Sequence, residues 1–145
     1  MIVSILCLLA ASSGYAQIST SGGNQTMTIT TGMAGGQPAN VINTSTTLRY
    51  KSQAVIAKIT VSTSCPGQKF GLSVLATSVT QGVAAPEVTL LNGNPSTDMV
   101  TDIPAGFHGN ASCTLQFTAS ANFSDGNSTE LGNDLHTITY TIQAQ

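Results

Sequence analysis

The chain has few side chains that could catalyse a reaction. Its only histidines are His108 and His136, and neither belongs to a Gly-x-Ser-x-Gly, His-Glu-x-x-His or glycine-rich phosphate-loop motif, since none of these occurs. Nucleophilic catalysis needs a base beside an exposed serine or cysteine. Serine is so common here that some serine near a histidine is expected by chance. We therefore predict that the protein is not an enzyme and that both histidines lie at the surface or the rim.

Paired acids are the groups that glycosidases use, and Asp98 and Asp102 are close in sequence. They lie in a segment bounded by proline and glycine, without aromatic neighbours on which a sugar could stack. We expect this segment to be a loop. It leaves one alternative function open, a secreted glycan-binding module or small hydrolase with its site here or in residues 122–134.

Residues 122–134 are rich in oxygen donors, and Ca²⁺ takes six to eight oxygen ligands. The calcium candidates in this segment are Asp125, Asn127, Glu130 and Asp134. The Asp-Gly-Asn order resembles part of a calcium loop, but the full EF-hand spacing is missing. Asp, Asn and Gly are also ordinary hairpin-loop residues. We accordingly predict no cofactor and no metal, with calcium as the alternative.

The first sixteen residues have the pattern of a secretory signal peptide. An apolar run from Ile2 to Ala11 passes into small residues that end at Ala16, although no Lys or Arg precedes the run. The run is about half as long as a membrane-spanning helix requires. We expect cleavage after Ala16, which leaves one domain, residues 17–145, in the periplasm, at the cell surface or outside the cell.

Two cysteines, Cys65 and Cys113, would remain after this cleavage. A pair of cysteines in an oxidising compartment typically forms a disulfide. Both have the parity of core-facing residues, one at the end of a predicted strand and the other at the start of one. Antiparallel strands would bring them to the same end of the domain. We therefore predict a buried Cys65–Cys113 disulfide, and the alternative is two unpaired buried thiols.

Charged side chains make up only 7% of the chain, against about a quarter in an average soluble protein. This composition excludes a coiled coil, a charged disordered tail and a basic nucleic-acid-binding protein. All four bases lie between Arg49 and Lys69, and all six acids follow. We interpret this order as a few solubilising charges on strands; the alternative is head-to-tail pairing between subunits. Residues 17–48 carry no charge, so they lack a main safeguard against edge pairing.

Apolar and polar residues alternate along most of the remaining chain, which indicates half-buried strands. Thr and Val, which are abundant here, favour such surfaces. Glycine, proline, asparagine and aspartate separate the alternating runs. We predict an antiparallel, Ig-like β-sandwich of about seven strands. The alternating runs include Met27 and Ile29; Leu48 and Tyr50; Val55 to Val61; Phe70 to Val74; Val88 and Leu90; Cys113 to Ala119; and Ile138, Tyr140 and Ile142.

The two ends of the mature chain resemble those of bacterial chaperone–usher pilin subunits. The last strand runs from His136 to the C-terminus with alternating Ile138, Tyr140 and Ile142, and Gly132 lies fourteenth from the end. The resemblance implies a sandwich that lacks one strand, a chaperone that pairs with the last strand, and a neighbour's N-terminal segment that fills the groove. Residues 17–32, with Met27 and Ile29, would be such a donor. The chain departs from the pattern at Ala144, where an aromatic residue is expected, and in its mid-chain cysteine pair.

Taken together, the sequence predicts an exported, non-catalytic structural or adhesive β-sandwich protein. The alternative from the resemblance is a pilin-type subunit that assembles by strand exchange. The expected partners are further copies or a surface assembly, bound through Met27, Ile29, Ile138, Tyr140 and Ile142 in the terminal strands. We expect no binding to nucleic acid and no insertion into a membrane once the signal is removed.

Overall fold

A computed structural model of the chain describes residues 2–11, 16–30, 36–52, 54–106, 111–122 and 132–145. These residues form eleven strands and no helix, so the predicted all-β fold is confirmed. Within these ranges, no helix with the length and apolar character needed to cross a membrane occurs.

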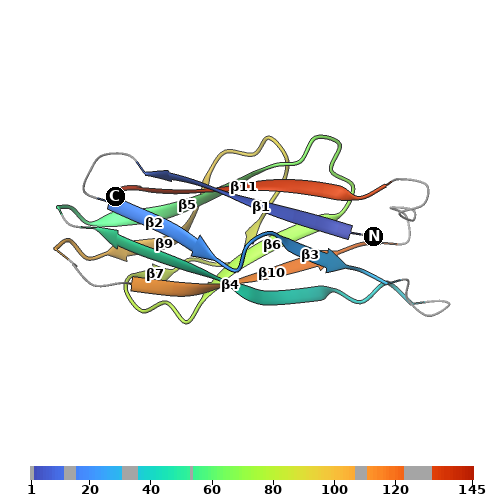
Figure 1. Cartoon of the computed structure of the whole chain (residues 1–145), viewed down its shortest axis with the longest axis horizontal. Helices are drawn as coiled ribbons and strands as arrows, with labels where there is room; N and C mark the ends of the chain where they lie inside the picture. Colours follow the sequence, from blue (N-terminus) through green and yellow to red (C-terminus); the bar gives the residue numbers. More distant parts are fainter. Residues whose placement is uncertain (1, 12–15, 31–35, 53, 107–110, 123–131) are drawn as a thin grey trace.

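The strands form two sheets, whose arrangement can be followed in Figure 1. The six-stranded sheet has the order β3 (Gln25–Thr28), β1 (Ile2–Ala11), β11 (Asp134–Ala144), β5 (Ala57–Ser64), β9 (Thr97–Ile103) and β7 (Val83–Ala84). The five-stranded sheet has the order β2 (Ala16–Ser21), β4 (Val41–Ser52), β10 (Ala111–Ser120), β6 (Gly71–Thr77) and β8 (Val88–Thr89). All neighbouring strands are antiparallel except β1 and β11, which run in the same direction.

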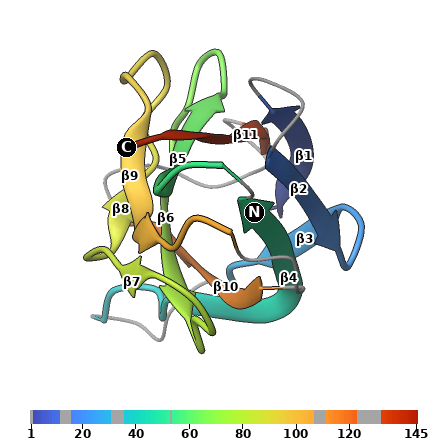
Figure 2. The ribbon, with the colours of Figure 1, turned by 90° about the vertical axis from the view of Figure 1, so that its left-hand side faces the viewer.

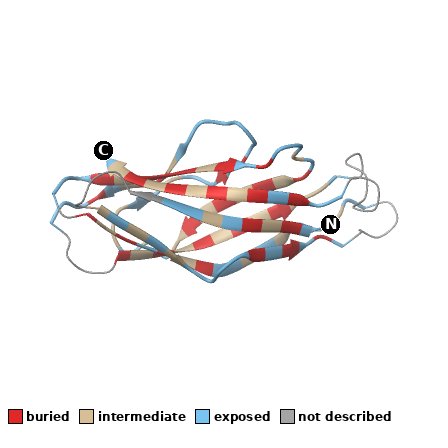
Figure 3. Ribbon diagram, turned by 45° about the horizontal axis from the view of Figure 1, so that its top comes forward, coloured by how far each residue is buried: buried red, intermediate tan, exposed pale blue. Residues whose placement is uncertain are grey.

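The two sheets pack face to face, as the end-on view in Figure 2 shows. Burial alternates along the strands, most regularly in β10 and β6, and Figure 3 shows this banding. The inward side chains form one apolar core, in which Phe117 and Tyr140 are among the largest fully buried residues. The predicted β-sandwich is thus present, and much of its core lies where period-two alternation placed it. Val55 is an exception, because it precedes β5 and is 49% exposed, so its predicted core-facing position was wrong.

The structure places strand β9 where the sequence indicated a loop. Met99 and Val100 are adjacent and both buried, and the pairing of β9 with β5 shifts register near Ile59. A strand with such an irregularity loses strict alternation, so its pattern did not indicate a strand. Asp98 and Asp102 accordingly lie on β9, and the loop prediction for them was wrong.

The predicted Cys65–Cys113 disulfide is not formed, and both thiols are free. The topology places them at opposite ends of the sandwich. Cys65 follows β5 and precedes the start of β6, where Gly71 pairs with Ser120 at the end of β10. Cys113 lies seven residues before Ser120, which is about 23 Å along an extended strand. A disulfide needs Cα atoms within about 7 Å. Both side chains point inward, as predicted. The prediction of a disulfide also assumed antiparallel strands, whereas β5 and β10 run in the same direction.

Candidate functional site

Strand β1 lies between the two terminal strands that the sequence marked for interaction. It pairs on one side with β3, where Val3 is opposite Met27, and on the other with β11 over nine positions. Along β11, Cys7 is opposite Ile138 and Leu9 is opposite Tyr140. The structure therefore gathers Met27, Ile138, Tyr140 and Ile142 around one strand, and Ile29 is buried just beyond β3.

The two faces of β1 differ in burial, although both carry large apolar side chains. Val3 and Ile5 are fully buried in the core, whereas Leu6 and Leu8, on the opposite face, are 44% and 55% exposed. The outer face of the neighbouring strand β11 carries Leu135, which is 63% exposed, and then threonines such as Thr137 and Thr139. The apolar outer face of β1 is the chemistry expected of a signal-peptide core.

The Cys7 thiol, on β1, lies against the Tyr140 hydroxyl inside the sandwich. Burial raises the pKa of Cys7, and its contact with Tyr140 partly offsets the rise. Burial also raises the pKa of Tyr140 well above its usual range, with Cys7 and Cys113 adding to the shift. Both groups are therefore neutral, and β1 completes the apolar surroundings of β11.

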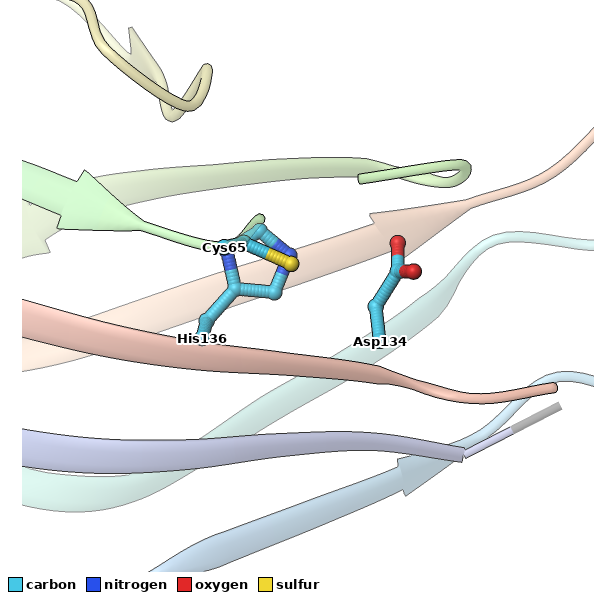
Figure 4. Close-up of side chains that lie close together, drawn as sticks. All are labelled: Cys65, Asp134 and His136. Atoms are coloured by element: carbon cyan, nitrogen blue, oxygen red, sulfur yellow. The ribbon is translucent and has the colours of Figure 1, made fainter. Parts of the chain in front are cut away.

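A second feature is a buried polar cluster formed by Cys65, Asp134 and His136 at one end of the six-stranded sheet (Figure 4). Asp134 and His136 are two residues apart on β11, so their side chains share its inner face. The register of β11 with β5 pairs Thr137 with Ser64, which brings Cys65 next to His136. One ligand atom from each residue lies within 4.8 Å of the others, and all three residues are at most 4% exposed.

Each residue of this cluster takes part in a hydrogen bond, through its side chain or its backbone. The Asp134 Oδ2 atom accepts from the backbone N–H groups of Lys69 and Phe70, at 3.0 and 2.8 Å. The His136 Nδ1 atom lies 3.0 Å from the Thr63 hydroxyl, while Nε2 is buried with no hydrogen-bond partner. The Cys65 backbone N–H donates to Asn92 Oδ1 at 2.8 Å. The cluster thus combines a carboxylate and an imidazole, each held through its side chain, with the thiol of a cysteine that is held through its backbone.

Burial also sets the protonation states in the cluster. It lowers the pKa of His136, and the Asp134 charge acts in the opposite direction. It raises the pKa of Cys65, with the Asp134 charge adding to the rise and the Leu135 N–H opposing it. In the absence of a cation, the imidazole and the thiol are therefore neutral near pH 7.

Several residues that the sequence singled out have other places in the structure. His136 is fully buried, so its prediction as a surface or rim residue was wrong. His108 and the calcium candidates Asp125, Asn127 and Glu130 lie outside the described residues. The fourth calcium candidate, Asp134, belongs to the buried cluster, where backbone N–H groups occupy one of its oxygens.

The acids proposed for glycan chemistry have structural partners. Asp98 forms an ion pair with Lys58 at 2.9 Å, and the two side chains come from neighbouring strands. Asp102 accepts hydrogen bonds from the Thr101 hydroxyl and the Gln145 amide, at 2.9 and 3.0 Å. These contacts fasten β9 to β5 and to the C-terminus.

The sequence did not indicate the cluster, although parity places each member on a core-facing position. The missing information was the register between β5 and β11, which determines that Cys65 meets His136. A comparison of the chain with known protein families and with curated proteins found no match.

Proposed function

We propose that the chain is an exported, non-catalytic structural or adhesive protein with an Ig-like sandwich, and that its mature form assembles by accepting a strand from a second copy. The observation that carries this proposal is the position of β1. The segment expected to be removed as a signal peptide is the strand between β3 and β11.

Cleavage after Ala16 would take β1 away and leave a vacancy in the sheet. Nine paired positions on β11 would lose their neighbour, and the core would lose Val3 and Ile5. An unpaired edge with an adjacent apolar opening is a template for β-augmentation, in which ladder hydrogen bonds supply affinity and side-chain pockets supply specificity. The mature sandwich would therefore be stable only with another strand in this vacancy.

The occupant that we infer is the N-terminal segment of a second copy, residues 17–30. Among the described residues, β3 pairs with β1 alone, so removal of β1 frees it. Donation of the whole segment also requires residues 17–21 of β2 to leave β4, with which they pair in the five-stranded sheet. This segment carries no charge, and its Met27 and Ile29 alternate as Val3 and Ile5 do. Fourteen extended residues reach about 46 Å, enough to cross to a neighbour and span a ten-residue strand. Each subunit would then both donate and accept.

A peptide-capture experiment tests this proposal. Residues 31–145, which lack the donor, are refolded with a synthetic peptide of residues 17–30. We expect a one-to-one complex that melts cooperatively, because the peptide restores the missing strand. A peptide with Met27→Asp and Ile29→Asp should not be captured, since burying an unpaired carboxylate is strongly unfavourable. Capture of both peptides, or of neither, would refute strand acceptance.

The glycan-binding alternative has less support. The ion pair of Asp98 with Lys58 and the hydrogen bonds of Asp102 occupy the carboxylates that such a site would need. The strand-acceptance proposal rests instead on a vacancy that signal removal would itself create.

A further inference from the structure

We propose that Cys65, Asp134 and His136 bind one zinc ion in the interior of the sandwich. Cys65 directly follows β5, whereas Asp134 and His136 lie on β11, far along the chain, yet one ligand atom of each lies within 4.8 Å of the others. This inference is independent of strand assembly, because all three residues follow the predicted cleavage point.

The orientation of His136 is the first support. When Nδ1–H donates to Thr63 Oγ1, at 3.0 Å, the lone pair of Nε2 is left for a metal ion. Nε2 is buried and has no hydrogen-bond partner. In Figure 4 the Cys65 sulfur lies at the edge of the imidazole that faces Asp134. A buried nitrogen without a partner is unfavourable, and a cation held by the three side chains would satisfy it.

The donor set favours zinc over the cations that prefer oxygen. Zinc binds thiolate sulfur, imidazole nitrogen and carboxylate oxygen at about 2.0–2.3 Å, whereas calcium and magnesium take oxygen ligands. Tetrahedral angles at those bond lengths separate the ligand atoms by about 3.3–3.6 Å. Side-chain rotations that draw the three atoms together by about 1 Å would close the site. A fourth position remains for a water molecule.

Charge balance is a further support. Zinc carries two positive charges, and the Cys65 thiolate with the Asp134 carboxylate would neutralise them. Metal binding requires the thiol to lose its proton, which is released to solvent. A neutral assembly is the form that a buried site tolerates, because unpaired charge is costly there. Asp134 Oδ2 accepts two backbone hydrogen bonds, and a carboxylate has a second oxygen for the metal.

Cobalt is a spectroscopic probe for such a site. The reduced full-length chain, treated with EDTA and then freed of it, is titrated with Co²⁺. We expect binding of one equivalent, with a thiolate-to-cobalt charge-transfer band in the near ultraviolet that one equivalent of Zn²⁺ abolishes. Zinc at about a hundred times its Kd should also raise Tm by roughly 5–15 °C. Absence of the band, or an unchanged Tm with zinc, would overturn the proposal.

Variants identify the ligands. Cys65→Ser should remove the charge-transfer band, whereas Cys113→Ser, at an equally buried cysteine outside the cluster, should keep it. Asp134→Asn keeps an oxygen for the backbone N–H groups and should weaken zinc binding at least tenfold. A band that survives Cys65→Ser would contradict the assignment. The wild-type titration remains decisive even if a variant does not fold.

Discussion

Replacing Ile5 with alanine in the full-length chain is expected to lower the free energy of unfolding by about 2–5 kcal/mol. Ile5 is fully buried, and on β1 it lies beside Gln25 and His136 in register. Truncation would leave a cavity in the core where β1 lies between β3 and β11. The midpoint of urea unfolding, with an unchanged m-value, measures this loss.

The matched control for Ile5→Ala is Leu8→Ala on the same strand. Leu8 is 55% exposed, so its truncation should cost less than about 1 kcal/mol. Equal effects of the two substitutions would mean that β1 does not pack as a strand of this sandwich. The pair therefore tests whether residues 2–11 complete the fold of the uncleaved chain.

Replacing Asp134 with alanine should cost about 2–5 kcal/mol of unfolding free energy in the presence of EDTA. The substitution removes the acceptor of two backbone N–H groups, at Lys69 and Phe70, and a buried donor without a partner costs about 1–3 kcal/mol. EDTA separates this loss from any effect of a bound metal ion. Chemical unfolding with circular dichroism detection gives the value.

Asp98→Ala is the control for Asp134→Ala. Asp98 forms an ion pair with Lys58 near the surface, where such pairs contribute about 1 kcal/mol or less. Asp134→Asn should lie between the two, because its amide oxygen still accepts hydrogen bonds. If Asp98→Ala were as harmful as Asp134→Ala, the anchoring role given to Asp134 would be incorrect.

The fold could be predicted from the sequence wherever the core is lined by strict alternation. The runs that contain Leu48, Phe117 and Tyr140 are strands in the structure, with these residues buried. Strand β9 was not predicted, because Met99 and Val100 are both buried and this breaks the alternation. Strand β1 was not predicted, because its unbroken apolar run is typical of a signal peptide as well as of a buried strand.

The candidate sites depended on information that periodicity does not carry. Cys65, Cys113 and His136 alternate in step with core-facing residues, which indicates that their side chains point inward. This alternation gives neither the direction of the strands nor their register. The direction of β5 and β10 places the two cysteines at opposite ends of the sandwich. The register between β5 and β11 places Cys65 beside His136. Such pairings between distant strands are set by the whole sandwich, so a reading of single strands does not determine them.

We propose that β1 (Ile2–Ala11) occupies the position that a strand of a second copy takes after cleavage. The most direct test is the molar mass of residues 17–145 and of the full-length chain, measured by light scattering over a range of concentrations. We expect the full-length chain to keep its single-chain mass of 14.8 kDa, and residues 17–145 to form β-rich multimers. A folded, stable monomer of residues 17–145 would contradict the account.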